Sequence, residues 1–247
     1  MLYIKPINLT TSPICDMLFA STCKGSLMKK FLLMALTVLG CAAMAYIESV
    51  LRPVYPVKSA LKWAVFAGCI VLYLLLSKDR APLRAFGRPD RHSLRLAGAL
   101  AAGVFVVITG GYLLLSPWLD FSAITDNLGA KEGITAATFP FVALYISFGN
   151  SFLEEFFFRG FAFLSLREFF PRFAWLFSAL AFSLYHVTIM DGWFSPALFL
   201  LLTAALVVAG LLFNWLDRQG TIWPAWLVHM AANLAINSIG MYLFGII

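Results

Sequence analysis

Charged side chains are scarce in this chain: Asp, Glu, Lys and Arg make up 12% of its 247 residues, while 62% are hydrophobic. A soluble globular domain has about 25% charged and about 45–50% apolar residues. So few charged side chains could not cover the surface of a water-soluble globule of this size. The scarcity excludes an ordinary soluble domain, and the sequence predicts an integral membrane protein.

Cysteine is also rare, with four copies that all lie in the first third of the chain. They lack the spacing of zinc ligands, and two of them fall in apolar runs, as small core residues do. The sequence therefore implies no disulfide framework. The four are Cys15, Cys23, Cys41 and Cys69.

Positive charge exceeds negative charge, which gives a formal net charge of +6. Such an excess can indicate nucleic-acid binding, but here the basic residues gather between apolar segments. The cytoplasmic loops of membrane proteins have this distribution of Lys and Arg. We therefore predict no nucleic-acid partner and expect the lipid bilayer to surround the chain.

Apolar segments long enough to cross a bilayer recur along the chain. The sequence therefore predicts an all-α fold, a polytopic membrane helix bundle with about seven transmembrane helices of about 20 residues each, within a range of six to eight. Residues 1–30 are interpreted as a polar N-terminal tail upstream of a plausible true start at Met28, and residues 31–247 as a single membrane-embedded domain. The predicted segments are 31–51, 61–77, 96–118, 138–166, 173–189, 196–216 and 222–246.

The distribution of Lys and Arg sets the expected orientation. If the N-terminus is inside, the inner loops hold most of the basic residues, since basic residues stay in cytoplasmic loops. We therefore predict a multi-pass protein of the cell membrane, with a cytoplasmic N-terminus and a C-terminus on the outer side. The outer side would then hold only Arg52, Lys58, Lys62 and Lys131.

Three charges interrupt the fourth apolar segment, in the stretch SFLEEFFFRG at 151–160. One charged residue at the centre of a membrane helix costs about 2.5–3.5 kcal/mol on insertion scales, so these three need partners or a wet cavity. Glu155 and Arg159 are four residues apart and can form an ion pair on one helix face. Glu154 is rotated about 100° away from Glu155, which leaves it as the carboxylate available for chemistry.

Two of the three histidines lie inside apolar segments. Alone, His186 or His229 would be interpreted as a core histidine bonded to a backbone carbonyl. With a rise of about 1.5 Å per residue, however, both fall at a depth in the bilayer similar to that of Glu154. Asn233 follows His229 by four residues and projects from the same helix face. The sequence thus predicts one site that combines a carboxylate, two imidazoles and an amide.

This set of side chains supports two mechanisms, and the residues alone do not separate them. In the first, Glu154 and His186 deprotonate a water molecule. His229 and Asn233 then donate hydrogen bonds to the oxyanion that forms on an attacked carbonyl. In the second, Glu154, His186 and His229 bind zinc and leave an open position for water.

Three short motifs, each on its own predicted helix, together resemble those of a known family. The three motifs follow one another in a predicted polytopic membrane protein. In this order they resemble the motifs of the CPBP family of CAAX proteases and bacteriocin-processing enzymes, also called the Abi family. Members of this family are intramembrane endopeptidases. The resemblance covers about residues 138–237, which we take as the catalytic core. The motifs are E-E-x-x-x-R at 154–159, F-x-x-x-H at 182–186 and H-x-x-x-N at 229–233.

The resemblance implies an all-helical membrane bundle whose site opens toward the cytoplasm. It implies that Glu154 and His186 activate the water, and that His229 and Asn233 stabilise the oxyanion. The substrates it implies are membrane-associated or lipid-modified proteins or peptides, prenylated or not. Supporting roles would fall to Glu155 and Arg159.

A zinc cofactor is an alternative, because the family is often labelled as metalloproteases although a metal-free glutamate mechanism has also been proposed for it. Asn233 is a natural oxyanion donor and a poor zinc ligand, which favours the metal-free mechanism.

Two further functions remain as alternatives at this stage. Buried Glu and His also form proton relays in membrane transporters, although the chain shows no internal repeat of the kind that many transporters have. The other alternative is a non-enzymatic membrane scaffold that keeps the fold and binds a partner.

Overall fold

The structure is a computed structural model that describes residues 13–118, 122–130, 132–190 and 195–247. Within these residues it consists of helices and contains no strand. The predicted all-α helix bundle is therefore confirmed. The long helices are α1 (Pro13–Tyr46), α2 (Tyr55–Ser77), α3 (Arg91–Leu115), α8 (Pro171–Ile189), α9 (Pro196–Leu216) and α10 (Trp223–Leu243).

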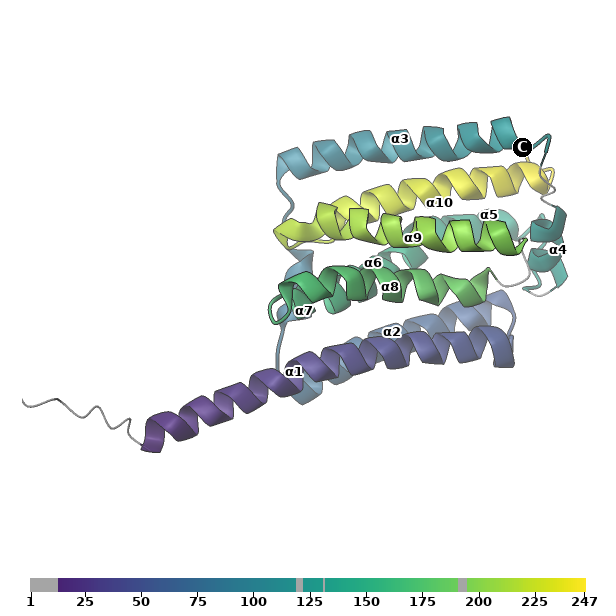
Figure 1. The fold of residues 1–247 in the computed structure, drawn as a ribbon. Helices are drawn as coiled ribbons and strands as arrows, with labels where there is room; N and C mark the ends of the chain where they lie inside the picture. The colour runs from purple at the N-terminus through teal and green to yellow at the C-terminus, as the bar shows by residue number, and fades with distance from the viewer. Residues whose placement is uncertain (1–12, 119–121, 131, 191–194) are drawn as a thin grey trace, which may run out of the picture.

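The long helices lie side by side, with their axes roughly parallel or antiparallel (Figure 1). α3 packs on α10, α8 on α9, and α1 on α2. The N-terminal part of α1 extends beyond the other helices (Figure 1), and α1 already begins at Pro13, so the helix reaches into the segment interpreted as a polar tail. The short helix α4 (Ser122–Ala130) lies at the opposite end of the bundle (Figure 1).

In the described part of the chain, five helices are long and apolar enough to cross a membrane. They support the prediction of a multi-pass membrane protein. The predicted segments 138–166 and 222–246 are helical too, but they are not among these five, and both carry polar residues of the candidate site. The five are Gly25–Leu51, Tyr55–Ser77, Arg91–Leu115, Pro171–Ile189 and Pro196–Gln219.

Large apolar side chains are exposed along the outward faces of these helices. A soluble monomer rarely exposes wide apolar patches, whereas lipid-facing helices must. The exposed positions recur on several different helices, so the apolar surface is not confined to one of them. Examples are Leu75, Val107, Leu113, Phe141 and Leu200, each at least two-thirds exposed.

A helical segment at 139–167 carries the charges of the fourth predicted segment. It runs through α5 (Phe139–Leu144), η3 (Tyr145–Asn150), α6 (Ser151–Glu155), η4 (Phe156–Leu164) and α7 (Ser165–Arg167), and contacts α2, α8 and α10. The stretches η3 and η4 are π-helical, with wider turns than the α-helix. Such widened turns are frequent at functional sites. Here they flank α6, which holds Glu154 and Glu155.

Side chains of other residues supply hydrogen bonds to backbone carbonyls in or next to the widened turns. Asn233 Nδ2 donates to Ile146 O at 3.2 Å, and Ser178 Oγ donates to Phe158 O at 2.7 Å. In a bilayer, a backbone carbonyl has no water to bond to and needs such a partner within the protein. These bonds therefore fix the 139–167 segment against α8 and α10.

The basic loops meet at one end of the bundle. Ile222 N donates to Ala85 O at 3.0 Å, and Arg167 Nη1 donates to Arg218 O at 2.7 Å. The segments after α2, after α7 and after α9 therefore lie together, as a common inner side requires. The orientation of this end relative to the cytoplasm stays a prediction.

Two lysines assigned to the outer side by sequence lie in α2, with only 8% of each residue exposed. Lys58 Nζ pairs with Glu48 at 2.6 Å and with Glu132 at 2.5 Å. Lys62 Nζ pairs with Glu154 at 3.0 Å. α2 begins at Tyr55 rather than at 61, so Lys62 lies about two helical turns inside the helix. The side of the membrane that this end of α2 faces stays a prediction.

The crossing of α8 and α9 depends on a glycine. A Cβ atom added at Gly210 would meet the Cα of Ala179 at 2.9 Å, closer than real Cβ contacts come. Small residues at helix crossings allow this close approach inside membranes. Gly103 in α3, by contrast, has no atom within 4 Å of such a Cβ.

We expect Gly210→Val to separate α8 from α9 and to destabilise the fold by about 1–3 kcal/mol, as overpacking does. Thermal unfolding of the purified protein in detergent measures the change. Gly103→Val is the matched control, because it adds the same side chain to a helix where space is free. Equal melting temperatures for the two variants would contradict the close crossing.

Candidate functional site

The carboxylate of Glu154 occupies the centre of the candidate site and is 1% exposed. Its Oε1 accepts hydrogen bonds from Lys62 Nζ at 3.0 Å and from Asn150 Nδ2 at 2.9 Å. Its Oε2 lies 3.7 Å from the Nε2 atoms of both His186 and His229, beyond hydrogen-bond distance. One oxygen is thus held by donors, while the other faces the two imidazoles.

Lys62 and Asn150 form a closed group with Glu154. Lys62 Nζ also donates to Asn150 Oδ1 at 2.6 Å, so each of the three side chains contacts the other two. The positive charge of Lys62 compensates the buried carboxylate, which alone would be costly in an apolar bundle.

Sequence reasoning did not include Lys62 or Asn150 in the site. Asn150 lies four residues before Glu154, the spacing that places two side chains on one helix face, and this signal could have identified it. Lys62 carried a weaker signal, a lysine within an apolar segment. Its contact with Glu154 depends on how α2 packs against α6, which local patterns do not report.

The backbone around His186 fixes which of its ring nitrogens carries a proton. His186 Nδ1 lies 2.7 Å from Phe182 O. A carbonyl oxygen can only accept, so Nδ1 must donate, and Nε2 of the neutral ring then carries a lone pair. That lone pair is on the atom nearest Glu154 Oε2.

His229 is oriented in the same way by a carboxylate. Its Nδ1 lies 2.7 Å from Glu155 Oε1, and an ionised carboxylate also only accepts. Nε2 of a neutral His229 therefore carries a lone pair, the second one near Glu154 Oε2. The site thus holds three hydrogen-bond acceptors around one point.

Glu155 and Arg159 form the ion pair that their spacing predicts. Arg159 Nε lies 3.2 Å from Glu155 Oε2, and both residues are 0% exposed. The guanidinium carbon lies 4.2 Å from the ring centre of Phe182 and 4.8 Å from that of Phe213, so aromatic faces surround the buried cation. Glu155 therefore joins Arg159 to His229 in one buried layer.

Asn233 lies on the helix face expected from sequence, but its amide is directed at the backbone. Its Nδ2 donates to Ile146 O, and Asn237, four residues on, donates to Ala143 O at 3.2 Å and to Ser147 Oγ at 3.0 Å. The structure thus brings Glu154, His186 and His229 around one point, while Asn233 holds the neighbouring widened turn η3.

The residues of this site fit a metal ion poorly. Among the described side chains, no group of three His, Cys, Asp or Glu residues is arranged to hold a metal. In addition, Glu154 Oε1 already contacts the Lys62 ammonium, whose positive charge opposes a dication on the same carboxylate. The zinc site that the sequence offered as an alternative is not supported by this arrangement.

Comparison with known proteins gives a match to the region that contains Glu154, His186 and His229. Residues 136–235 match the family described as "Type II CAAX prenyl endopeptidase Rce1-like". The match covers the three motifs and confirms the resemblance to the CAAX proteases. No curated protein and no solved structure matches the chain.

The contact between Lys62 and Glu154 can be tested by a double-mutant cycle. We expect Lys62→Met alone to destabilise the protein by about 3–5 kcal/mol, because it leaves Glu154 as an unpaired buried charge. Adding Glu154→Gln should recover part of this loss, with a coupling free energy of about 1–3 kcal/mol in detergent unfolding.

The control cycle is the pair Lys29–Asp79, which lies at a similar distance of 3.1 Å but has a lysine side chain that is 32% exposed. Exposed pairs couple by about 0.2–1 kcal/mol. If the Lys62–Glu154 coupling were no larger than that of Lys29–Asp79, the buried pair would not compensate the Glu154 charge.

Proposed function

Because residues 136–235 match the Rce1-like family of type II CAAX prenyl endopeptidases, we propose that this protein hydrolyses a peptide bond within the membrane at Glu154. The single observation that carries the proposal is the convergence of three acceptors, Glu154 Oε2 and the Nε2 atoms of His186 and His229. A water molecule at this point could donate its two O–H groups to two of these acceptors.

The proposed water lies between Glu154 Oε2 and one imidazole. A gap of 3.7 Å leaves room for one oxygen atom at about 2.8 Å from both acceptors. Both O–H bonds then point at protein acceptors, so the lone pairs of the water point away from them, toward a substrate carbonyl. The water is therefore oriented for attack before the substrate arrives.

In the first step, the water oxygen bonds to the carbonyl carbon as one O–H bond breaks. The proton passes to Glu154, directly or through His186, and the carbonyl oxygen becomes an oxyanion. In the second step, the C–N bond breaks and the same proton goes to the leaving nitrogen. Glu154 thus acts first as a base and then as an acid.

His229 stabilises the oxyanion in this proposal, and the structure limits how it can do so. Its Nδ1 hydrogen is directed at Glu155, so Nε2 can donate only after the ring has taken up a second proton from solvent, separate from the proton that Glu154 accepts. The Glu155 carboxylate, 2.7 Å away, would form a salt bridge with the charged ring. Asn233 has a second amide hydrogen beyond the one bonded to Ile146 O, which would complete the oxyanion site.

Lys62 and Asn150 position the base. By occupying Oε1 of Glu154, they direct Oε2 at the water and keep the carboxylate ionised, the form that accepts a proton. Neither residue needs to contact the substrate.

No step of this mechanism passes through a metal. The family match favours an endopeptidase over the transporter and over the scaffold. The substrate class follows from the membrane setting: a protein or peptide held at the bilayer, with a lipid-modified C-terminus of the CAAX type as the first to examine.

The function is tested with a fluorogenic prenylated CAAX peptide and purified protein in detergent. We expect Glu154→Gln to lower the cleavage rate by about 10²–10⁴-fold, because the amide cannot accept the proton of the water. Cleavage by the wild type should persist in a strong chelator, since Glu154 and the histidines act without a metal.

Glu168→Gln is the matched control: the same change at a carboxylate whose side chain is 46% exposed and pairs with Arg84 at the surface. It should leave the rate unchanged. Cleavage by Glu154→Gln at the wild-type rate would reject Glu154 as the base, and loss of wild-type cleavage in chelator would reject the metal-free mechanism.

A further inference from the structure

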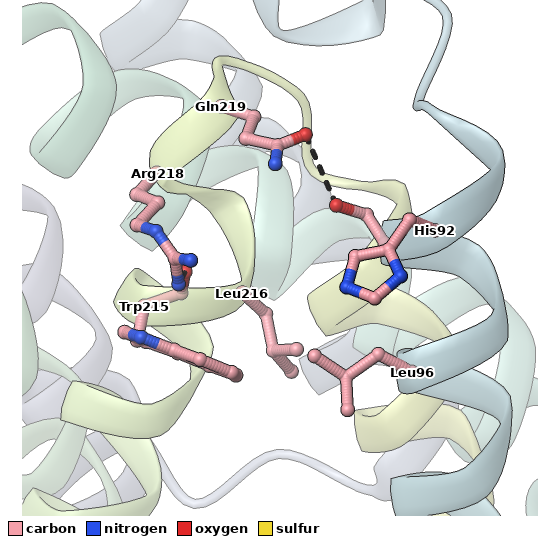
Figure 2. Close-up of a pocket in the computed structure, with 7 residues that line it drawn as sticks. His92, Leu96, Trp215, Leu216, Arg218 and Gln219 are labelled. Atoms are coloured by element: carbon pink, nitrogen blue, oxygen red, sulfur yellow. Dashed lines mark hydrogen bonds between the residues drawn. The ribbon is translucent and has the colours of Figure 1, made fainter.

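A cavity of about 100 Å³ lies between the start of α3 and the end of α9, away from Glu154. Figure 2 shows its walls: His92 and Leu96 come from α3, and Trp215, Leu216, Arg218 and Gln219 come from the end of α9 and the turn after it, η5 (Asp217–Gln219). A hydrogen bond of 3.0 Å between Ser93 Oγ and Gln219 Oε1 joins the two walls.

The cavity lies at the level where two membrane-spanning helices reach the bilayer surface. One span begins at Arg91 and the other ends at Gln219, so both walls consist of terminal turns. Trp215 is 37% exposed, and tryptophan is enriched at this level of membrane proteins, where headgroups begin. A lipid molecule can therefore reach the cavity from the bilayer.

Arg218 is held in place at the cavity by contacts with Trp215 that leave its positive charge without a described carboxylate partner. Its Nη1 donates to Trp215 O at 2.9 Å, and its guanidinium carbon lies 4.4 Å from the centre of the Trp215 indole (Figure 2). None of the described carboxylates lies within salt-bridge distance of Arg218. The neighbouring Asp217 is buried and bonds to Ala225 N at 3.0 Å.

The opposite wall adds a second polar group and an apolar surface. His92 is exposed at the cavity mouth, and its ring carries an N–H donor in either tautomer. Asp90, the acidic residue two positions before it, already accepts from Ser93 N at 2.9 Å. Leu96 and Trp215 add apolar side chains, so the cavity lining combines the Arg218 cation with apolar surface.

We propose that this cavity binds an anionic phospholipid. The phosphate of the headgroup would bond to Arg218 and His92, and an acyl chain would lie along Leu96 and Trp215. The basic residues at this end of the bundle favour an anionic over a zwitterionic headgroup. They include Arg88, Arg91, Arg95 and Arg167. The proposal is independent of the catalytic chemistry at Glu154.

Thermal unfolding in detergent, with added phosphatidylglycerol, phosphatidylcholine or inorganic phosphate, tests the site. We expect phosphatidylglycerol to raise the melting temperature of the wild type, and native mass spectrometry to show a retained lipid. Phosphatidylcholine should give a smaller shift and inorganic phosphate none, because phosphate alone lacks the acyl contact.

Arg218→Gln and His92→Leu should each lose at least half of the phosphatidylglycerol shift. The matched control is Arg172→Gln, which removes the same charge from an exposed residue that does not line the cavity. Having two variants on opposite walls guards against a folding defect in one. If phosphatidylglycerol shifted the melting temperatures of Arg218→Gln and Arg172→Gln equally, the effect would come from general surface charge and the site would be rejected. If inorganic phosphate shifted the melting temperature of the wild type as much as phosphatidylglycerol does, a lipid would be rejected as the ligand.

Discussion

The burial of charge inside an apolar bundle is the constraint on which the rest of this structure depends. Glu154, Glu155 and Arg159 lie on one helical segment and are almost completely buried. Each needs an opposite charge or a hydrogen-bond partner, because an isolated ion in this environment is unstable. Arg159 compensates Glu155 within the segment, and Lys62 compensates Glu154 from α2. The packing of α2 against the 139–167 segment is thereby tied to the state of the proposed base.

The same constraint acts on the backbone of that segment. Its two π-helical stretches, η3 and η4, lie beside polar side chains of α8 and α10 that bond to its carbonyls. Asn233 belongs to the motif that suggested an oxyanion donor, yet its described hydrogen bond is to Ile146 O. One amide can serve both roles because it has two N–H donors. Structural and proposed catalytic functions therefore share a residue.

Local spacing predicted the parts of the site that lie on single helices. The i, i+4 relation of Glu155 and Arg159 was enough to predict their ion pair, and the hydropathy of the chain was enough to predict a helical membrane bundle. The contribution of Lys62 could not be predicted in this way. It depends on where α2 begins and on which helix faces it, and an apolar pattern fixes neither to better than a few residues. The proton positions on His186 and His229 also required the structure, since they are set by Phe182 O and Glu155 Oε1.

Those proton positions have a consequence for what the site can recognise. With both imidazoles neutral, the three groups that converge on the reaction point, Glu154 Oε2 and the two Nε2 atoms, are acceptors, and an intact amide carbonyl is an acceptor too. These three groups thus offer the substrate carbonyl no favourable polar contact, and the proposed donor to it is the second amide hydrogen of Asn233. Once water has added, the tetrahedral carbon carries a hydroxyl group that can donate, and the proton released can charge an imidazole. Complementarity then arises during the reaction rather than before it, which is the discrimination between ground state and transition state that catalysis requires. A stable gem-diol, such as a hydrated fluoroketone, would present the same donors.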